Sequence, residues 1–311
     1  MKGLELSRKY YEQYGREMIE NQFSDIADKL AVGLFGSGSE CYGYDDEISQ
    51  DHDFEPGFCI FVPDEIDSKT LFQLERSYNK LPKEFMGYSK NILSPVGGNR
   101  HGVFNISEYF SERTGSCNGN LTVSQWFSLP EYVLLETVNG EIFSDRYGLL
   151  TEIRNRLSYY PEDIRLKKLA GNLIMMNQSG QYNYQRCLNR NDQGAAQLAV
   201  SEFVTYAYKT VFLLNRQYCP YYKWVFRAMR ELERLSYIAD FLEYLLNSGN
   251  SPEEVKSKTD MINNVVSLIV SELLQQELIE KETDDLEKAA HMVNKKISDN
   301  NIRNLNILIG V

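Results

Sequence analysis

The sequence is poor in the residues that build disulfide frameworks and zinc sites. Its 311 residues include five cysteines and three histidines, and the cysteines are scattered and odd in number. No two cysteines form a CxxC pair, so we expect neither a disulfide framework nor a zinc site. Free, buried thiols are the expected state of these cysteines. They are Cys41, Cys59, Cys117, Cys187 and Cys219.

Long apolar runs and an excess of positive charge are also lacking. No stretch reaches the roughly 20 apolar residues that a membrane-spanning helix needs. Residues 1–20 are charged throughout and do not resemble a signal peptide. The net charge of −11 argues against a broad nucleic-acid-binding surface, which requires a basic face. We therefore expect a cytoplasmic protein with no membrane partner and no nucleic-acid partner.

Two common nucleotide-binding motifs are missing. The sequence has no Gly-Lys-Ser/Thr of a P-loop and no GxGxxG followed by a ribose-binding acid. These absences exclude P-loop and dinucleotide-binding folds. The length and the hydrophobic content of 42% are enough for about two domains with a sizeable core.

One stretch does carry a recognisable pattern of chemistry. The apolar run Ala31 to Phe35 breaks into Gly36-Ser37-Gly38-Ser39, and Asp51-His52-Asp53 precedes a second apolar run, Phe58 to Val62. The pattern predicts a strand, a glycine turn, a helix start, a loop and a second strand. Because side chains alternate along a strand, Asp51 and Asp53 are expected on one face and His52 on the other.

These residue types suit a magnesium-bound phosphate. Two adjacent carboxylates repel each other, and a divalent cation removes that penalty. Magnesium is usually held by one or two carboxylates together with substrate phosphates. Glycine lets the backbone approach a ligand, and amides at a helix N-terminus point at an anion. The alternative interpretation is an ordinary glycine turn followed by acidic loop residues at the surface.

This order of motifs resembles the core of the DNA polymerase beta-like nucleotidyltransferase superfamily. The fuller string GSGSECYGYDDEISQDHDFEPGF, with the later YPEDIR, GQYNY and YKW, resembles an uncharacterised family within that superfamily. The resemblance implies that Gly36 and Ser37 contact nucleotide phosphates and that Asp51 and Asp53 hold Mg²⁺.

Members of the superfamily usually take a third carboxylate, often the general base, from a strand in the region of residues 97–107. Glu108 is the nearest acid here, but it is equally explained as a first-turn acid of a helix with Ser107 as its N-cap. Glu55 is a second candidate.

The expected fold class is α+β, with two domains. Residues 1–149 are expected to form a nucleotidyltransferase domain, a small mixed β-sheet with flanking helices, and residues 150–311 an all-α helical bundle. The aromatic-rich segment 122–135 is expected to pack beneath the sheet. Strands are expected over 97–107 and 141–143 besides the two above. Helices are expected over residues 4–19, 24–30, 64–80, 160–180, 194–215, 221–246, from 251 onward, and 283–297.

Superfamily members with two such domains bind the acceptor between them. By that analogy Tyr182, Arg216, Tyr222 and Lys223 are expected to face the cleft, where a cation neutralises triphosphate charge and a tyrosine stacks on a base or sugar. Each of these residues also has an ordinary explanation as a core or surface side chain.

The sequence therefore leads to two main functional hypotheses. The first is a Mg²⁺-dependent enzyme that transfers a nucleoside monophosphate from a nucleoside triphosphate to a hydroxyl of a small molecule or a protein, with Ser39 as a further phosphate contact. The second is a nucleotide-binding regulatory or interaction protein that has lost turnover. A nucleic-acid-end modifier is a third alternative, which salt-sensitive RNA binding would support.

Overall fold

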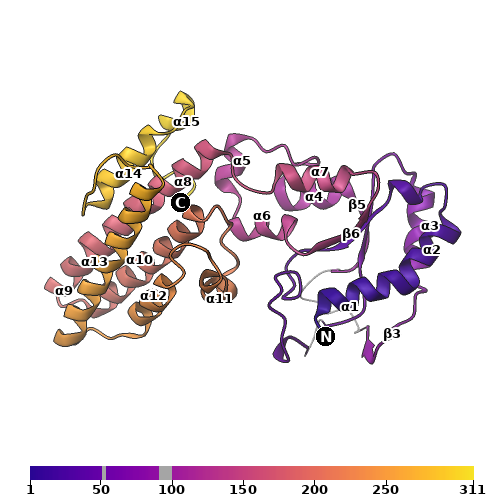
Figure 1. Cartoon of the computed structure of the whole chain (residues 1–311), viewed down its shortest axis with the longest axis horizontal. Coiled ribbons are helices and arrows are strands. Elements are labelled where there is room, and N and C mark those ends of the chain that lie inside the picture. Colours follow the sequence, from indigo (N-terminus) through magenta and orange to yellow (C-terminus); the bar gives the residue numbers. More distant parts are fainter. Residues whose placement is uncertain (51–53, 91–99) are drawn as a thin grey trace. The chain divides into compact units, whose positions relative to one another are not determined.

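The structure is a computed structural model that describes residues 1–50, 54–90 and 100–311 (Figure 1). It is α+β and 58% helical, with a small mixed sheet, so the predicted fold class is confirmed. By internal contacts the chain divides into two compact units. We call residues 1–125 and 133–158 the sheet unit, and residues 126–132 and 159–311 the helical unit.

A four-stranded sheet forms the centre of the sheet unit. Its strands are β1 (Ala31–Leu34), β2 (Cys59–Val62), β5 (Gly102–Asn105) and β6 (Glu141–Asp145), in the order β5-β2-β1-β6. β1 runs antiparallel to β2 and β6, whereas β2 runs parallel to β5. Every residue of β1 and β2 is buried, which explains why both strands are apolar runs without alternation. The four strands expected from the sequence are all present.

This topology brings four chain segments to one edge of the sheet. Gly33 of β1 pairs with Cys59 of β2, and Cys59 pairs with Gly102 of β5. Leu34 pairs with Glu141 at the start of β6. The carboxyl end of β1 therefore lies beside the amino ends of β2, β5 and β6. We call this the bend edge, because β1 leads there into the bend Gly36–Gly38.

A long helical segment covers the sheet. It consists of α1 (Gly3–Tyr10), the π-helical turn η1 (Tyr11–Gly15) and α2 (Arg16–Gln22), and it confirms the helix expected over 4–19. Its aromatic face packs against Phe58, whose ring lies 5.8 Å from that of Tyr10 and 5.4 Å from that of Tyr11. The spacing of apolar residues thus predicted the buried face correctly.

The remaining elements of the sheet unit are short. They are η2 (Ala27–Lys29), η3 (Ile48–Gln50), α3 (Ser68–Tyr78), β3 (Glu84–Phe85), β4 (Tyr88–Ser89), α4 (Ile106–Thr114) and α7 (Leu149–Arg156). The helix expected over 64–80 is confirmed as α3, while the one expected over 24–30 is only the 3₁₀ turn η2. The cap of α4 is Asn105, whose side chain accepts from the Glu108 N–H at 3.0 Å. The expectation that Ser107 caps this helix is therefore wrong.

Two helices carry the chain from one unit to the other. They are α5 (Val123–Ser128) and α6 (Glu131–Val138), and the residues between their ends, Trp126–Tyr132, belong to the helical unit. There the Trp126 ring lies 5.7 Å from that of Tyr160. The expectation that this aromatic stretch packs beneath the sheet is wrong for Trp126–Tyr132, because its rings find their partners in the helical unit.

One helical segment runs without a break through the first part of the helical unit. It comprises α8 (Glu162–Met176), the π-helical stretch η4 (Asn177–Asn183) and α9 (Tyr184–Asn189). The predicted stop near Gly180 is wrong. Gly180 lies directly against the ring of Phe203, where a β-carbon would collide, so this glycine permits close helix packing and does not end the helix.

The next helix, α10 (Gln193–Leu214), has the expected length. Phe203, Val211 and Leu214 are buried as expected, but Leu198 is 73% exposed, so its assignment to the inner face is wrong. The prediction of a single helix over 221–246 is also wrong. This segment forms three separate elements, η5 (Tyr222–Trp224), α11 (Val225–Arg230) and α12 (Ile238–Asn247).

The last helices begin at clear capping signals. α13 (Pro252–Gln275) has a complete capping box between Ser251 and Glu254 with proline at the first position, as expected. α14 (Leu286–Lys295) and α15 (Asn300–Arg303) are capped by aspartate side chains. None of the helices in the described ranges is both long and apolar enough to cross a membrane.

Candidate functional site

The bend Gly36–Gly38 borders a cavity of about 390 Å³ within the sheet unit. Besides the bend, the charged residues that line this cavity are Glu40, Arg100, Glu112, Arg113 and Glu136. We call it the bend cavity. Its size is in the range of small-molecule sites.

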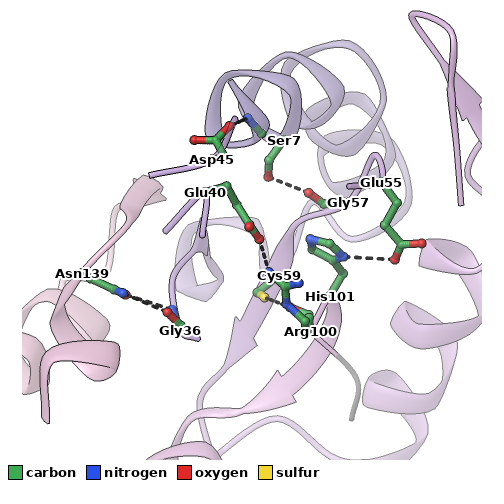
Figure 2. A network of polar contacts seen from close by, with 11 residues as sticks. Ser7, Gly36, Glu40, Asp45, Glu55, Gly57, Cys59, Arg100, His101 and Asn139 are labelled. Carbon is green, nitrogen blue, oxygen red and sulfur yellow. Dashed lines mark hydrogen bonds and ion pairs between the residues drawn. The ribbon is translucent and has the colours of Figure 1, made fainter. Parts of the chain in front are cut away.

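The sequence Asn139-Gly140 holds the bend in place. The Gly36 N–H donates to Asn139 Oδ1 at 2.9 Å, and Asn139 Nδ2 donates to the Gly36 carbonyl at 2.8 Å (Figure 2). Gly36 has φ +132°, a conformation open to glycine. The Gly36 amide is thus engaged by Asn139, whereas Ser37 is exposed and its hydroxyl forms no hydrogen bond with another described residue.

No helix follows the bend. The Cys41 N–H donates to the Gly38 carbonyl at 2.9 Å and the Tyr44 N–H to the Ser39 carbonyl at 2.9 Å, which makes a series of turns. Gly43, with φ +74°, lies within these turns in a conformation that would strain other residues. The expected helix start is therefore wrong. Ser39 shapes this turn and is not among the described residues that line the cavity.

An ion pair lies over the bend. Arg100, just before β5, contacts Glu40 across Gly38 (Figure 2). A β-carbon at Gly38 would collide with both side chains. The glycine is therefore required for the approach of the ion pair, which links the segment after β1 to the segment before β5.

A contact between a histidine and a glutamate connects the segments that precede β2 and β5. His101 Nδ1 lies 3.2 Å from Glu55 Oε1, and Figure 2 shows the two side chains facing each other. The His101 ring lies against Gly57, where a β-carbon would be 2.5 Å from it. Glu55, a candidate for metal ligation from the sequence, thus has a histidine as its partner.

The charges around the bend cavity are mixed. Glu136 accepts from the Tyr42 hydroxyl at 2.9 Å, and burial raises the pKa of its carboxyl group. Arg113 stacks on the ring of Tyr109 at 3.5 Å and donates to the Tyr109 carbonyl. Within the described part of the chain no carboxylate forms an ion pair with Arg113, so its guanidinium is available to an anion in the cavity.

The two aspartates at the centre of the sequence-based hypothesis, Asp51 and Asp53, lie outside the described residues, as does His52. Glu108 is exposed in the first turn of α4 and does not line the bend cavity, which fits its interpretation as a first-turn acid. Among residues 1–50, 54–90 and 100–311, no three or more histidine, cysteine, aspartate or glutamate side chains form a group that could hold a metal ion.

Sequence reasoning missed most of the charged lining. Tyr109, Glu112 and Arg113 share one face of α4, since residues three and four apart are neighbours on a helix. Once a helix had been assigned to this segment, the spacing would have indicated that these three side chains lie together. Glu40 and Arg100 are 60 residues apart and carry no such signal.

The residues expected to face a cleft have local partners in the helical unit. Arg216 pairs with Glu162 at 2.8 Å and adopts φ +53°. Lys223 lies 5.0 Å from the ring of Trp224, and the ring of Tyr222 lies 4.5 Å from that of Tyr221. These three predicted residues follow one another in a single loop region after α10.

Tyr182 lies elsewhere in the same unit. It is 54% exposed, and the Arg186 guanidinium lies 4.6 Å from its ring. Glu162, the partner of Arg216, begins the same helical segment twenty residues earlier, which corresponds to roughly 30 Å of helix. The structure therefore does not bring Tyr182 together with Arg216.

One family model matches the chain. Residues 126–225 match a family described as Domain of unknown function (DUF4037). No curated protein and no solved structure matches the sequence. The matched segment contains the strings YPEDIR, GQYNY and YKW but not the bend. Residues 126–225 of this chain are therefore similar to a protein family that has itself no described function.

Proposed function

We propose that the protein transfers a nucleoside monophosphate from a nucleoside triphosphate to an acceptor hydroxyl, in a Mg²⁺-dependent reaction at the bend edge. The acceptor hydroxyl oxygen forms a bond to the α-phosphorus, the bond from that phosphorus to the bridging oxygen breaks, and pyrophosphate leaves. The hydroxyl proton passes to a carboxylate or to water. The acceptor is a small molecule or a protein.

The observation that carries this proposal is the convergence of strand ends on one cavity. The exposed Ser37, with two guanidinium groups from Arg100 and Arg113, borders a space of about 390 Å³. Guanidinium groups and a serine hydroxyl are suitable donors to phosphate oxygens. Transfer of a phosphoryl group depends mainly on positioning and on neutralising charge, which such a cavity could supply.

The electrostatics of the cavity support a role for a divalent cation. Glu40, Glu112 and Glu136 line the same space as the two arginines, so a triphosphate alone would meet more acidic than basic side chains. Asp51 and Asp53, which precede β2 in the sequence, would hold Mg²⁺, and the ion would neutralise triphosphate charge and activate the acceptor oxygen. Glu55, the first described carboxylate after them in the sequence, lies at the bend edge beside His101.

The second candidate is a nucleotide-binding protein without turnover, acting in regulation or in an interaction. The engagement of the Gly36 amide by Asn139 and the exposed position of Glu108 outside the cavity favour it. Because the Gly36 amide already donates to Asn139, it is not free to donate to a phosphate. Because Glu108 lies outside the cavity, it is not positioned to act as a base beside the phosphates.

The two candidates are separated by measuring binding and turnover in parallel. Purified protein is incubated with each of the four triphosphates, labelled at the α-phosphate, with Mg²⁺ and with pools of small metabolites or of proteins as acceptors. The expected result is Mg²⁺-dependent pyrophosphate release with transfer of the label. Asp51→Asn and Asp53→Asn are expected to reduce the rate at least about a hundredfold.

Asp25→Asn is the matched control, since Asp25 is an exposed aspartate of the same unit and should leave the rate unchanged. Mg²⁺-dependent triphosphate binding without release of pyrophosphate in any acceptor pool would favour the second candidate. Absence of triphosphate binding at millimolar concentration in the presence of Mg²⁺ would refute both.

A further inference from the structure

A second cavity, of about 380 Å³, lies entirely within the helical unit. The chain reaches it from five places: the residues before and at the start of α6, the middle of α8, the last turns of α10, the segment that follows α10, and Gly310 with Val311. We call it the lysine cavity. It is separate from the bend cavity and shares no lining residue with it.

The feature that sets this cavity apart is a buried ammonium group. Lys168 lines the cavity although only 4% of the residue is exposed. Its Nζ donates to the Gly310 carbonyl at 2.9 Å and lies 5.4 Å from the ring of Tyr160. No described carboxylate lies within ion-pair distance of it, and an ammonium group can donate three hydrogen bonds. A buried lysine without a carboxylate at ion-pair distance is costly, so a bound anion would relieve that cost.

Two further charged groups belong to the same site. Lys209, half-buried on α10, lines the cavity, and its Nζ lies 5.2 Å from the ring of Tyr206, with no described carboxylate at ion-pair distance. Glu131 accepts from the Cys219 N–H at 3.0 Å. Lys168 and Lys209 act electrostatically on Glu131, and burial nevertheless raises the pKa of its carboxyl group. The charged lining thus consists of two cations and one carboxylate.

One buried side-chain amide at the cavity has no hydrogen-bond partner in the described structure. Asn172 is 3% exposed, lines the cavity, and forms no side-chain hydrogen bond with another described residue. It lies one helical turn after Lys168 on α8, so the two side chains share one face of the helix. Buried amides are almost always hydrogen-bonded, which points to a ligand or to water as its partner.

The rest of the lining is aromatic and apolar. Tyr132 and Tyr221 lie with their rings 5.4 Å apart at the cavity, and Phe127 and Pro130 line it as well. Such walls hold the body of a small organic molecule, while a few polar groups fix its orientation. Of the residues that line this cavity, only Gly310 and Val311 lie outside the segment 126–225 that matches the family model.

We propose that the lysine cavity binds a small aromatic or apolar molecule that carries a carboxylate or a phosphate and a hydrogen-bond donor. The anionic group is held by Lys168 and Lys209, with Asn172 as a further donor. The hydroxyl or amino group donates to Glu131, and the body of the molecule lies against Tyr132 and Tyr221. This site stands independently of the nucleotide chemistry proposed for the bend cavity.

Ligand-observed NMR and calorimetry on the full chain, without nucleotide, test the proposal. The probes are 4-hydroxybenzoate and 4-hydroxyphenyl phosphate, which carry the two anionic groups on the same hydroxylated ring, and 4-hydroxybenzyl alcohol, which has that ring but no charge. The expected result is binding of at least one anionic probe and at least about tenfold weaker binding of the alcohol. The probe that binds more tightly identifies the anionic group of the natural ligand.

Lys209→Met is the principal variant, because Lys209 is half-buried and its replacement disturbs the interior less than replacement of the buried Lys168. It should weaken binding of the anionic probe at least about tenfold and leave the circular dichroism spectrum unchanged. Lys168→Met should do the same if it folds. Lys256→Met, which removes an exposed lysine of the same unit, should bind as the natural protein does.

Three outcomes would overturn the proposal. They are failure of both anionic probes to bind at millimolar concentration, equal binding of the neutral alcohol, and equal affinity of the Lys209→Met and Lys256→Met variants. None of them bears on the chemistry at the bend edge, because no triphosphate enters the experiment.

Discussion

At the scale of single residues, Gly33 lies where the backbone of β6 closely approaches β1. The register between β1 and β6 shifts between Val32 and Gly33, and a β-carbon on Gly33 would lie 2.6 Å from the Glu141 carbonyl oxygen. The atoms it would meet belong to the backbone of β6, which cannot rotate away as a side chain can. The sheet therefore depends on a residue without a side chain at this position.

Gly33→Ala is expected to lower the free energy of unfolding by about 1–3 kcal/mol, because β6 must shift to accept the methyl group. Urea denaturation followed by circular dichroism measures the change. Gly194→Ala is the control: this glycine lies near the start of α10 with open space around it. Alanine there should leave stability unchanged or raise it by about 0.5 kcal/mol. Equal effects at both positions would contradict the account.

A second residue-scale prediction concerns Cys59 in β2. Burial raises the pKa of its thiol to about 12, whereas a thiol in an unfolded chain titrates near about 8.5. Between these values the folded protein keeps a proton that the unfolded chain releases. The stability contributed by this group is therefore fully present below about pH 8.5 and is lost as the pH rises toward 12, by up to about 1.4 kcal/mol per pH unit.

Cys59→Ala should accordingly show a shallower fall of unfolding free energy between about pH 8.5 and 10 than the natural protein. Urea midpoints measured in the presence of a reducing agent give this slope. Cys117→Ala, which removes an exposed thiol, should keep the natural slope. Parallel slopes for the natural protein and Cys59→Ala would show that the thiol is not protected by burial.

The candidate site was predictable from the sequence only where its residues are neighbours in the chain. Gly36 and Ser37 stand beside an apolar strand, and both line the bend cavity, while their predicted contact with phosphates stays a prediction. The arginines could not be found in this way. Arg100 reaches Gly38 because β2 and β5 run parallel, and that pairing depends on strand order, which local composition does not encode.

At the scale of elements, the best-marked helix start in the chain is that of α13. The Ser251 side chain accepts from the Glu254 N–H at 3.4 Å, and Glu254 accepts in return from the Ser251 N–H at 3.0 Å. These bonds satisfy amides that the first helical turn leaves without partners. Hydrogen bonds from the Ser251 side chain and from the Ser251 and Gly249 amides hold the pKa of the Glu254 carboxyl group below its usual value.

Ser251→Ala should therefore cost about 1 kcal/mol of unfolding free energy, within the range measured for caps. Thermal and urea denaturation are the measurements. Ser271→Ala is a control within the same helix, where the serine is exposed and its hydroxyl bonds only to the Ser267 carbonyl. Alanine there should be neutral or slightly stabilising. A loss of similar size at Ser271 would argue against a specific capping effect.

Helix boundaries were predicted correctly where a cap marks them, and a predicted helix end was wrong where a glycine serves close packing. The capped start of α13 is an example of the first kind. Gly180 is an example of the second, since its missing side chain makes room for the ring of Phe203 within a continuous helical segment. The exposed Leu198 shows that helical spacing alone does not decide which apolar residues are buried.

At the scale of the whole molecule, the main feature is that the chain passes back and forth between the two units. The chain leaves the sheet unit after Gln125, contributes Trp126–Tyr132 to the helical unit, and returns at Val133 before its final crossing after Ser158. Within the helical unit, Glu131 accepts from the Cys219 N–H and Tyr132 lies against Tyr221. A single cut after Ser158 therefore leaves part of the helical unit covalently attached to the sheet unit.

A site-specific protease sequence inserted after the exposed Ser158 tests this arrangement. After cleavage the two pieces should elute together in gel filtration under native conditions, because Trp126–Tyr132 stays packed in the helical unit. They should separate in concentrated urea, and uncleaved protein serves as the reference in both buffers. Separate elution without denaturant would show that the contacts of this segment are too weak to hold the pieces together.

The α+β class and the strands were within reach of the sequence, since apolar runs and turn residues mark them locally. The passage of residues 126–132 into the helical unit and back could not be predicted from the sequence. Nothing in the composition of residues 126–132 distinguishes rings that pack on a sheet from rings that pack on helices, because burial of aromatic surface is favourable in both places.

The pairing of β6 with β1 also sets an order of events during synthesis. β1 ends at Leu34, but its neighbour β6 ends only at Asp145. One side of β1 must therefore wait, with its amides and carbonyls unpaired, until more than a hundred further residues have left the ribosome. Until then the nascent chain presents an open strand to any passing chaperone or neighbouring polypeptide.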